Sequence, residues 1–219
     1  AVAISDGFGS IAIARGSNAT ATAEGWFSRA IVRGDDSTAD ATGGNFNTAR
    51  VYGDNNDADA TGGNFNTVRI VGHGNVGTAT DGYSVVYLRS DVSSATTSGE
   101  GFSQAIIVGE SNSATAFAQS RSRSKAVIIG SDSFANTVGN EGSTAIARIV
   151  GSAINSLSFA QGGADAVSFV SGAESSSVAT AFGDGGLGRG ATVVLIGEDN
   201  ADTASATDGR AAVVVRGTD

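Results

Sequence analysis

The sequence ADATGGNFNT occurs twice, at residues 39–48 and again at residues 58–67, so the two copies lie 19 residues apart. Looser copies of the pattern extend along the chain in both directions. In each copy a marker residue follows a short apolar run. The markers are Gly16, Gly34, Gly53, Gly72, Ser90, Gly109, Gly130, Gly151, Gly172, Gly197 and Gly217. A repeat of about 20 residues is typical of arrays in which each unit packs on the next.

Each repeat contains two short segments in which apolar and polar residues alternate, such as AIVRG at 30–34 and ADATGG at 39–44. Alternation with a period of two predicts β-strands, and the Gly, Ser, Asn and Asp residues between them favour turns. We therefore predict an all-β protein, a single parallel β-solenoid over residues 1–219. It would be a two-strand β-roll of about eleven coils, each of 18–25 residues. Residues 1–109 would form narrow coils, and residues 110–219 wider coils with a Gly-rich insert at 183–190.

The inward positions of the two strands differ in size. The strand before each marker places a branched residue two positions before the marker: Val32, Val51, Ile70, Leu88, Ile107, Ile128, Ile149, Val170, Leu195 and Val215. The other strand presents mostly alanine: Ala21, Ala39, Ala41, Ala58, Ala60, Ala79, Ala95, Ala114 and Ala116. Branched residues facing alanine predict a thin core.

The alanine rule ends in the later repeats, where larger residues enter the second strand: Phe134, Leu157, Phe159, Val178 and Phe182. Two explanations stay open. Either these coils are wider, or a slip of one residue exchanges the inward and outward sets.

One aromatic residue recurs at a turn of the early repeats, at Phe8, Phe27, Phe46, Phe65, Tyr83 and Phe102. Aromatic residues spaced by one coil predict a ladder of rings. We expect this ladder to be structural, with a carbohydrate-stacking platform as the alternative.

The outward positions of the strand before the marker change character along the chain. They include Arg15, Arg33, Arg50, Arg69 and Arg89 in the early repeats and apolar residues later. The apolar residues are Ile106, Val108, Val127, Ile129, Val150, Phe169, Val194, Ile196 and Val214. Strands with two apolar faces are usually covered on both, and monomers seldom expose so large a patch. We expect these nine residues to form an oligomer interface.

The outward positions of the other strand carry Thr and Asp, and we consider them a possible ligand face: Thr20, Thr22, Asp40, Thr42, Asp59, Thr61, Thr78 and Thr80. A Thr-rich solenoid face resembles that of solenoid ice-binding proteins. Thr is also a favourable residue in exposed strands, which is the structural explanation.

Chemistry-bearing residues are scarce. The chain has no Cys and a single histidine, His73, so we expect no catalytic site and no enzyme activity. Carboxylates in the turns, such as Asp35, Asp54 and Asp91, could bind Ca²⁺, but we expect neither a resident metal nor another cofactor. The net charge of −9 argues against nucleic acid as a partner. No apolar run reaches the roughly 18 residues of a membrane span, so we expect no membrane insertion.

Two segments, SIAIARGSNATATAEG at 10–25 and AIIVGESNSATAFA at 105–118, are similar to the repeats of the head domains of trimeric autotransporter adhesins. The resemblance implies a β-roll with one apolar strand face in its own core and the other on a trimer axis. The repeats here are longer than those of that family.

Together these features predict a secreted or cell-surface structural or adhesive solenoid that self-associates. It would do so through the apolar sheet face or through uncapped ends, as a closed oligomer or a filament. The alternative is a ligand-binding solenoid, for ice on the Thr/Asp face or for glycans on the aromatic column.

Overall fold

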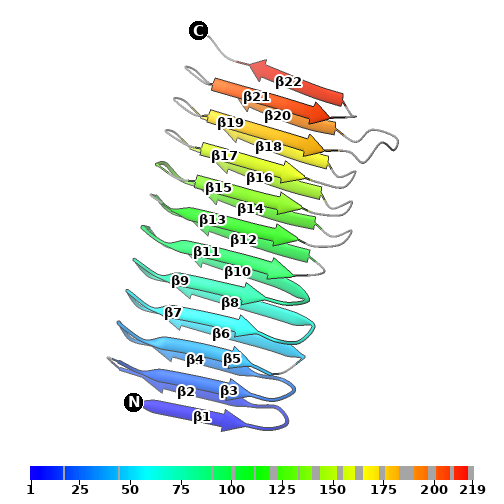
Figure 1. Ribbon diagram of the computed structural model, residues 1–219. Coiled ribbons are helices and arrows are strands. Elements are labelled where there is room, and N and C mark those ends of the chain that lie inside the picture. Colours follow the sequence, from blue (N-terminus) through cyan, green and yellow to red (C-terminus); the bar gives the residue numbers. More distant parts are fainter. Residues whose placement is uncertain are drawn as a thin grey trace.

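The chain forms a rod built from two layers of β-strands, seen in a computed structural model (Figure 1). The structure describes residues 1–16, 18–43, 45–89, 91–99, 102–110, 112–118, 123–132, 134–139, 144–151, 155–160, 165–172, 176–182, 190–196, 201–207 and 210–216. The predicted Gly-rich insert at 183–190 lies almost wholly outside these ranges. The described residues include no helix that could cross a membrane.

One layer, here called the odd sheet, contains eleven parallel strands that follow one another by hydrogen bonding. They are β1 (Val2–Asp6), β3 (Thr20–Glu24), β5 (Thr38–Thr42), β7 (Asp57–Thr61), β9 (Val76–Thr80), β11 (Ser94–Gly99), β13 (Ser113–Ala118), β15 (Phe134–Gly139), β17 (Asn155–Ala160), β19 (Ser176–Phe182) and β21 (Ala201–Thr207).

The other layer, the even sheet, is also parallel and has eleven strands. They are β2 (Ile11–Arg15), β4 (Arg29–Arg33), β6 (Phe46–Tyr52), β8 (Phe65–Val71), β10 (Tyr83–Arg89), β12 (Phe102–Val108), β14 (Arg123–Ile129), β16 (Thr144–Val150), β18 (Asp165–Ser171), β20 (Gly190–Ile196) and β22 (Arg210–Arg216). The chain alternates between the two layers, so the parallel β-solenoid predicted from the repeat is confirmed.

The core lies between the sheets and is as thin as the sequence predicts. The branched column from Val32 to Val170 is fully buried in the even sheet, and it faces alanines such as Ala39, Ala58 and Ala79 in the odd sheet. Where the even sheet contributes the larger pair Val68 and Val86, the facing position is Gly77. A Cβ at Gly77 would lie 2.9 Å from Cγ1 of Val86. Larger side chains on one sheet are therefore matched by a smaller residue on the other sheet, as close packing requires.

The late coils keep this arrangement, so the slip of one residue offered for Phe134, Leu157, Phe159 and Val178 is wrong. The odd strands are longer in this part of the chain, with six or seven residues from β11 onward against five in β1 to β9. These strands pair without a slip, since Ala114 aligns with Ala135, and Ala116 with Thr137. Ala135 and Thr137 are fully buried, whereas Phe134 is 38% exposed. The large residues therefore point outward, because a core facing Ile128 has room only for small side chains. Phe182 is not among the residues whose side chains are described.

Stacked glycines mark the turns after β4, β6 and β8. Gly34, Gly53 and Gly72 have φ values of 147°, 140° and 153°. A Cβ on any of them would overlap the carbonyl oxygen of the marker glycine one coil earlier. The marker thus requires glycine both for its backbone angle and for the close approach of neighbouring coils.

Buried polar side chains form ladders inside both turns. After the even strands, the backbone N–H groups of Ser37 and Asn56 donate to Oδ1 of Asn56 and Asn75, at 2.6 and 2.7 Å. At the other turn, Nδ2 of Asn47 donates to Oδ1 of Asn66 at 3.0 Å. Each ladder joins one coil to the next, so buried hydrogen bonds supplement the small apolar core.

Candidate functional surfaces

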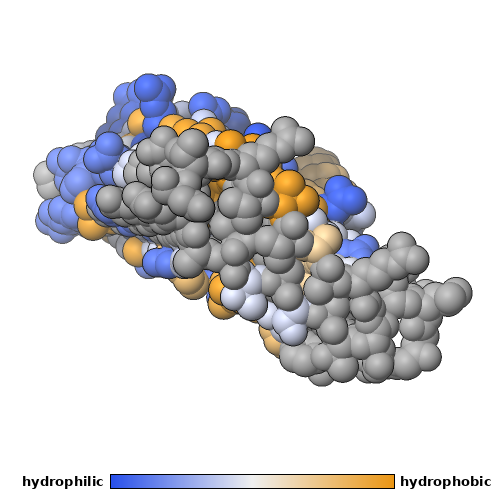
Figure 2. All heavy atoms as spheres, turned by 90° about the horizontal axis from the view of Figure 1, so that it is seen from above, coloured by the Kyte–Doolittle hydropathy of each residue, from blue (hydrophilic) through white to orange (hydrophobic). Residues whose placement is uncertain are grey.

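The outer face of the even sheet places the predicted interface residues in two adjacent columns. Pairing aligns Ile106 with Val127, and Phe169 with Val194. The next column contains Val108, Ile129, Val150 and Ile196. All nine residues lie outside the core, with Ile129 49% exposed and Val214 41% exposed. Viewed from above, apolar side chains are visible at the molecular surface (Figure 2).

Sequence reasoning missed a third apolar column on the same face. Ile146 and Val167 pair directly and point outward beside the other two columns. The same alternation that identified Val127 and Ile129 would have identified them. We call the resulting surface the even apolar patch; it consists of the nine predicted residues together with Ile146 and Val167.

Arginine and aromatic side chains also pair across neighbouring even strands. The guanidinium carbon of Arg33 lies 5.6 Å from the ring centre of Tyr52, that of Arg69 lies 5.9 Å from Tyr87, and that of Arg148 lies 5.2 Å from Phe169. These distances are within the range of cation–π attraction. The pairs hold guanidinium groups extended on the outer surface.

The aromatic column forms the predicted ladder at one margin of the even face. Phe27, Phe46, Phe65 and Tyr83 stack with centroid separations of 5.7, 5.0 and 5.3 Å. Phe8 meets Phe27 edge to face. Because each stacked ring covers the face of its neighbour, the ladder presents mainly ring edges to solvent. This geometry favours a structural ladder over a carbohydrate-stacking platform.

The outer face of the odd sheet contains all eight residues of the predicted ligand face. Thr22, Asp40, Asp59 and Thr78 form one column. Thr42, Thr61 and Thr80 continue beside it, while Thr20 lies in a third column with Thr38 and Asp57. The aspartates interrupt the threonine array for two coils, so the face lacks the regularity expected of an ice-binding lattice.

The aspartates on this face repel one another. Burial raises the pKa of Asp40 above its ordinary value, and the charges of Asp59 and Asp57 raise it further. Burial likewise raises the pKa of Asp57, with Asp59 adding to the effect. The odd strands contain no Lys or Arg, so no cation on their own element neutralises these carboxylates.

Replacing Asp59 with Thr is expected to stabilise the monomer by about 0.5 kcal/mol at pH 7, because like charges on adjacent strands are destabilising. A raised carboxyl pKa means that the folded state binds protons more tightly than the unfolded state. The protonated carboxyl of Asp40 therefore contributes its stability to the folded state below pH 3.8, the ordinary pKa of an aspartate. This contribution is lost as the pH rises through the raised pKa of Asp40. The gain from the substitution should accordingly be absent at about pH 3.

Urea unfolding of the Asp59→Thr protein at the two pH values measures this gain. Glu24→Thr is the control, since Glu24 lies on the same face but contributes to neither shift. An equal gain in both variants, or one that persists at low pH, would contradict the repulsion between the aspartates.

The turn carboxylates proposed as Ca²⁺ ligands accept backbone hydrogen bonds. Oδ1 of Asp35 accepts from the N–H of Asp54, Oδ1 of Asp54 from His73, and Oδ1 of Asp91 from Glu110, at 2.7–2.9 Å. Each carboxylate therefore links its coil to the next. Over the described part of the chain, no three His, Cys, Asp or Glu side chains converge on a point where a metal could bind.

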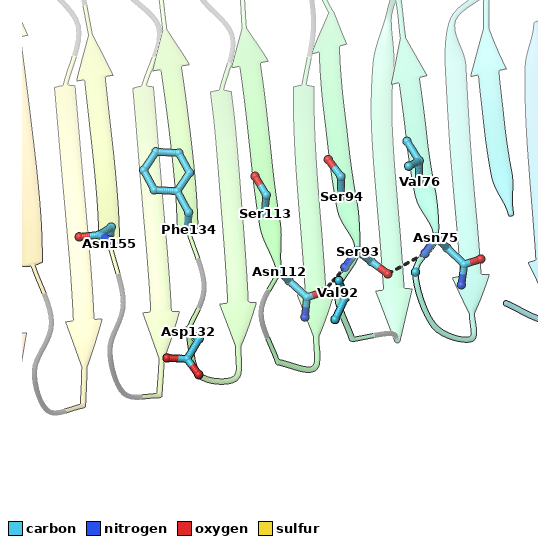
Figure 3. Close-up of a pocket in the computed structure, with 11 residues that line it drawn as sticks. Asn75, Val76, Val92, Ser93, Ser94, Asn112, Ser113, Asp132, Phe134 and Asn155 are labelled. Carbon is cyan, nitrogen blue, oxygen red and sulfur yellow. Dashed lines mark hydrogen bonds between the residues drawn. The ribbon is translucent and has the colours of Figure 1, made fainter. Parts of the chain in front are cut away.

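A shallow groove of about 590 Å³ crosses several coils where the odd strands begin (Figure 3). Val76, Val92 and Phe134 line it together with Asn75 and Ser93. The N–H of Asn75 donates to Oγ of Ser93 at 2.9 Å, and the Ser93 hydroxyl donates to the carbonyl of Asp91. The groove is thus the outer side of the polar ladder described above.

The sequence matches no protein-family model, and no curated protein or solved structure is significantly similar to the chain.

Proposed function

We propose that this chain is a non-catalytic structural module of a secreted or cell-surface protein, and that it self-associates through the outer face of its even sheet. The observation that supports this most directly is the even apolar patch. Its residues form adjacent columns on β12 to β22, interrupted only by single residues such as Lys125, Arg148 and Ser171, so the surface is mainly apolar. Surfaces of this kind usually bind another protein surface.

The resemblance to trimeric adhesin heads supports the same proposal, because that family uses the outer face of one strand layer for assembly. A rigid rod of stacked coils suits a scaffolding or adhesive role. At roughly 4.8 Å per strand, eleven strands give a rod about 50 Å long.

Light scattering after size exclusion, over a hundredfold range of protein concentration, tests the proposal. The wild-type mass should be a multiple of 21.5 kDa or should grow with concentration. The double variant Val127→Glu/Ile129→Glu should remain at the monomer mass, because it places two charges in the patch. A multiple of three would support the trimeric arrangement.

The double variant Asn45→Glu/Asn64→Glu is the matched control, since it adds the same charge in two equivalent exposed turns. It should assemble as the wild type does. Circular dichroism checks that both variants fold. A monomeric wild type, or unchanged assembly of Val127→Glu/Ile129→Glu, would rule out the proposal.

A further inference from the structure

Positive charge is concentrated on one side of the rod. Nine of the thirteen Lys and Arg residues point outward from even strands: Arg15, Arg29, Arg33, Arg50, Arg69, Arg89, Arg123, Lys125 and Arg148. The even strands contain a single carboxylate, Asp165. We call the six arginines of β2–β10 the arginine patch. Because the whole chain has a net charge of −9, its composition alone does not show that one face is strongly basic.

Negative charge lies on the opposite side of the same coils. Asp6, Glu24, Asp40, Asp57 and Asp59 point outward from β1, β3, β5 and β7, and we call them the acidic patch. The two sheets separate the patches, so the arginines and these carboxylates point away from each other. Both patches therefore face outward and could pair only with another molecule.

The later coils repeat this two-sided arrangement with apolar residues. The even apolar patch covers one face. On the other face, Phe134, Val138, Leu157, Phe159 and Val178 point outward from β15, β17 and β19, and we call them the odd apolar patch. Along the rod, the odd face thus has an acidic N-terminal part and an apolar C-terminal part. The even face has an arginine-rich N-terminal part, followed by a mainly apolar part that also carries Arg123, Lys125 and Arg148.

From these two complementarities we infer that the even face of one molecule docks on the odd face of a second copy, with the two rods parallel. The arginine patch then meets the acidic patch, and the even apolar patch meets the odd apolar patch. This inference rests on the proposed self-association and names the surface that receives the even face.

The other pairings of faces are less favourable. Two even faces side by side would oppose arginine patches if parallel, and would cover arginines with apolar residues if antiparallel. Two odd faces would oppose acidic patches if parallel, and would cover carboxylates with apolar residues if antiparallel. Burying unpaired charge is costly. The parallel even-on-odd contact is the most favourable of these pairings, because among the described side chains it leaves only the three cations Arg123, Lys125 and Arg148 facing apolar residues.

The carboxylates that would receive the arginines are already crowded. Burial and mutual repulsion raise the pKa of Asp40 and Asp57, while Glu24 on β3 and Asp6 on β1 are the other charged groups of β1 to β7 on this face. An approaching guanidinium would relieve this repulsion. The contact joins the even face of one copy to the odd face of another. Each growing assembly therefore still exposes one even face and one odd face, so it would grow laterally without closing.

A charge-exchange experiment tests the inference. Arg50→Glu/Arg69→Glu should weaken self-association by tenfold or more, and Asp40→Lys/Asp59→Lys should do so to a similar extent, since each opposes like charges at the contact. Mixing the two variants should restore assembly, as should combining all four substitutions in one chain. Glu110→Lys, in an exposed turn, is the control and should assemble like the wild type.

The outcomes separate this inference from the proposed function. If the wild type assembles and Val127→Glu/Ile129→Glu blocks it, but the mixture does not recover, the proposed function stands and the face-to-face pairing is wrong. If only Arg50→Glu/Arg69→Glu loses assembly and mixing it with Asp40→Lys/Asp59→Lys does not restore assembly, the arginine patch binds some other anion, which dextran sulfate binding would reveal. A wild type that stays monomeric overturns both.

Discussion

Replacing Gly53 with alanine is expected to lower the free energy of unfolding by about 4 kcal/mol, among the largest effects of a single substitution. Gly53 has φ of 140°, a conformation that side-chain-bearing residues rarely adopt. Its Cβ would also overlap the carbonyl oxygen of Gly34 and lie 2.8 Å from Oδ1 of Asp35. Relief would require neighbouring coils to separate, which would break the hydrogen bonds between them.

Gly43→Ala isolates the conformational part of this effect. Gly43 has φ of 74°, and a Cβ there would meet only the backbone nitrogen of Gly25, at 3.7 Å. Its loss should be about 1 kcal/mol. Chemical unfolding followed by circular dichroism compares the two variants, and equal losses would show that the close approach of the marker glycines is unimportant.

The second large effect is expected for Asn66→Leu, with a loss of about 3 kcal/mol, since several buried polar groups would each lose a partner. Asn66 is fully buried. Its Nδ2 donates to the carbonyls of Thr80 and Asp81, and its Oδ1 accepts from Nδ2 of Asn47. Leucine is similar in size but can make none of these bonds.

Asn66→Ser should cost much less, because serine occupies the equivalent position in the next coil, at Ser84. The Ser84 hydroxyl lies within hydrogen-bonding distance of the carbonyls of Asp81 and Ser98, at 2.7 and 3.1 Å. The same unfolding measurement ranks the two variants. If serine and leucine were equally destabilising, the turn ladder would not depend on hydrogen bonding.

The sequence predicts the repeat and the strand alternation well, because both depend on spacing that is visible along the chain. Val51 and Ile70 recur at the repeat distance and alternate with outward residues, so their burial could be predicted. The outward direction of Phe134 and Leu157 could not, because the decisive fact is that Ala135 and Thr137 still fill the inward positions. The alignment of neighbouring coils is needed to see this.

The roles of the turn residues were also hidden. Asn47, Asn56, Asn66 and Asn75 resemble ordinary turn formers, yet all four are buried and hydrogen-bonded to neighbouring coils. Their recurrence at 19 residues was the available signal. Likewise, a net charge for the whole chain could not show that the basic and acidic residues occupy opposite faces.

The exact ten-residue repeat at 39–48 and 58–67 also says how such a chain can change in length. Because every column of side chains continues from one coil to the next, gaining or losing one whole coil leaves each remaining residue on its original face. A duplication that changes the length of a strand, instead of adding a whole coil or lengthening a turn, would shift the following residues out of their columns. Recombination between repeated gene segments can thus lengthen the rod while preserving both surfaces.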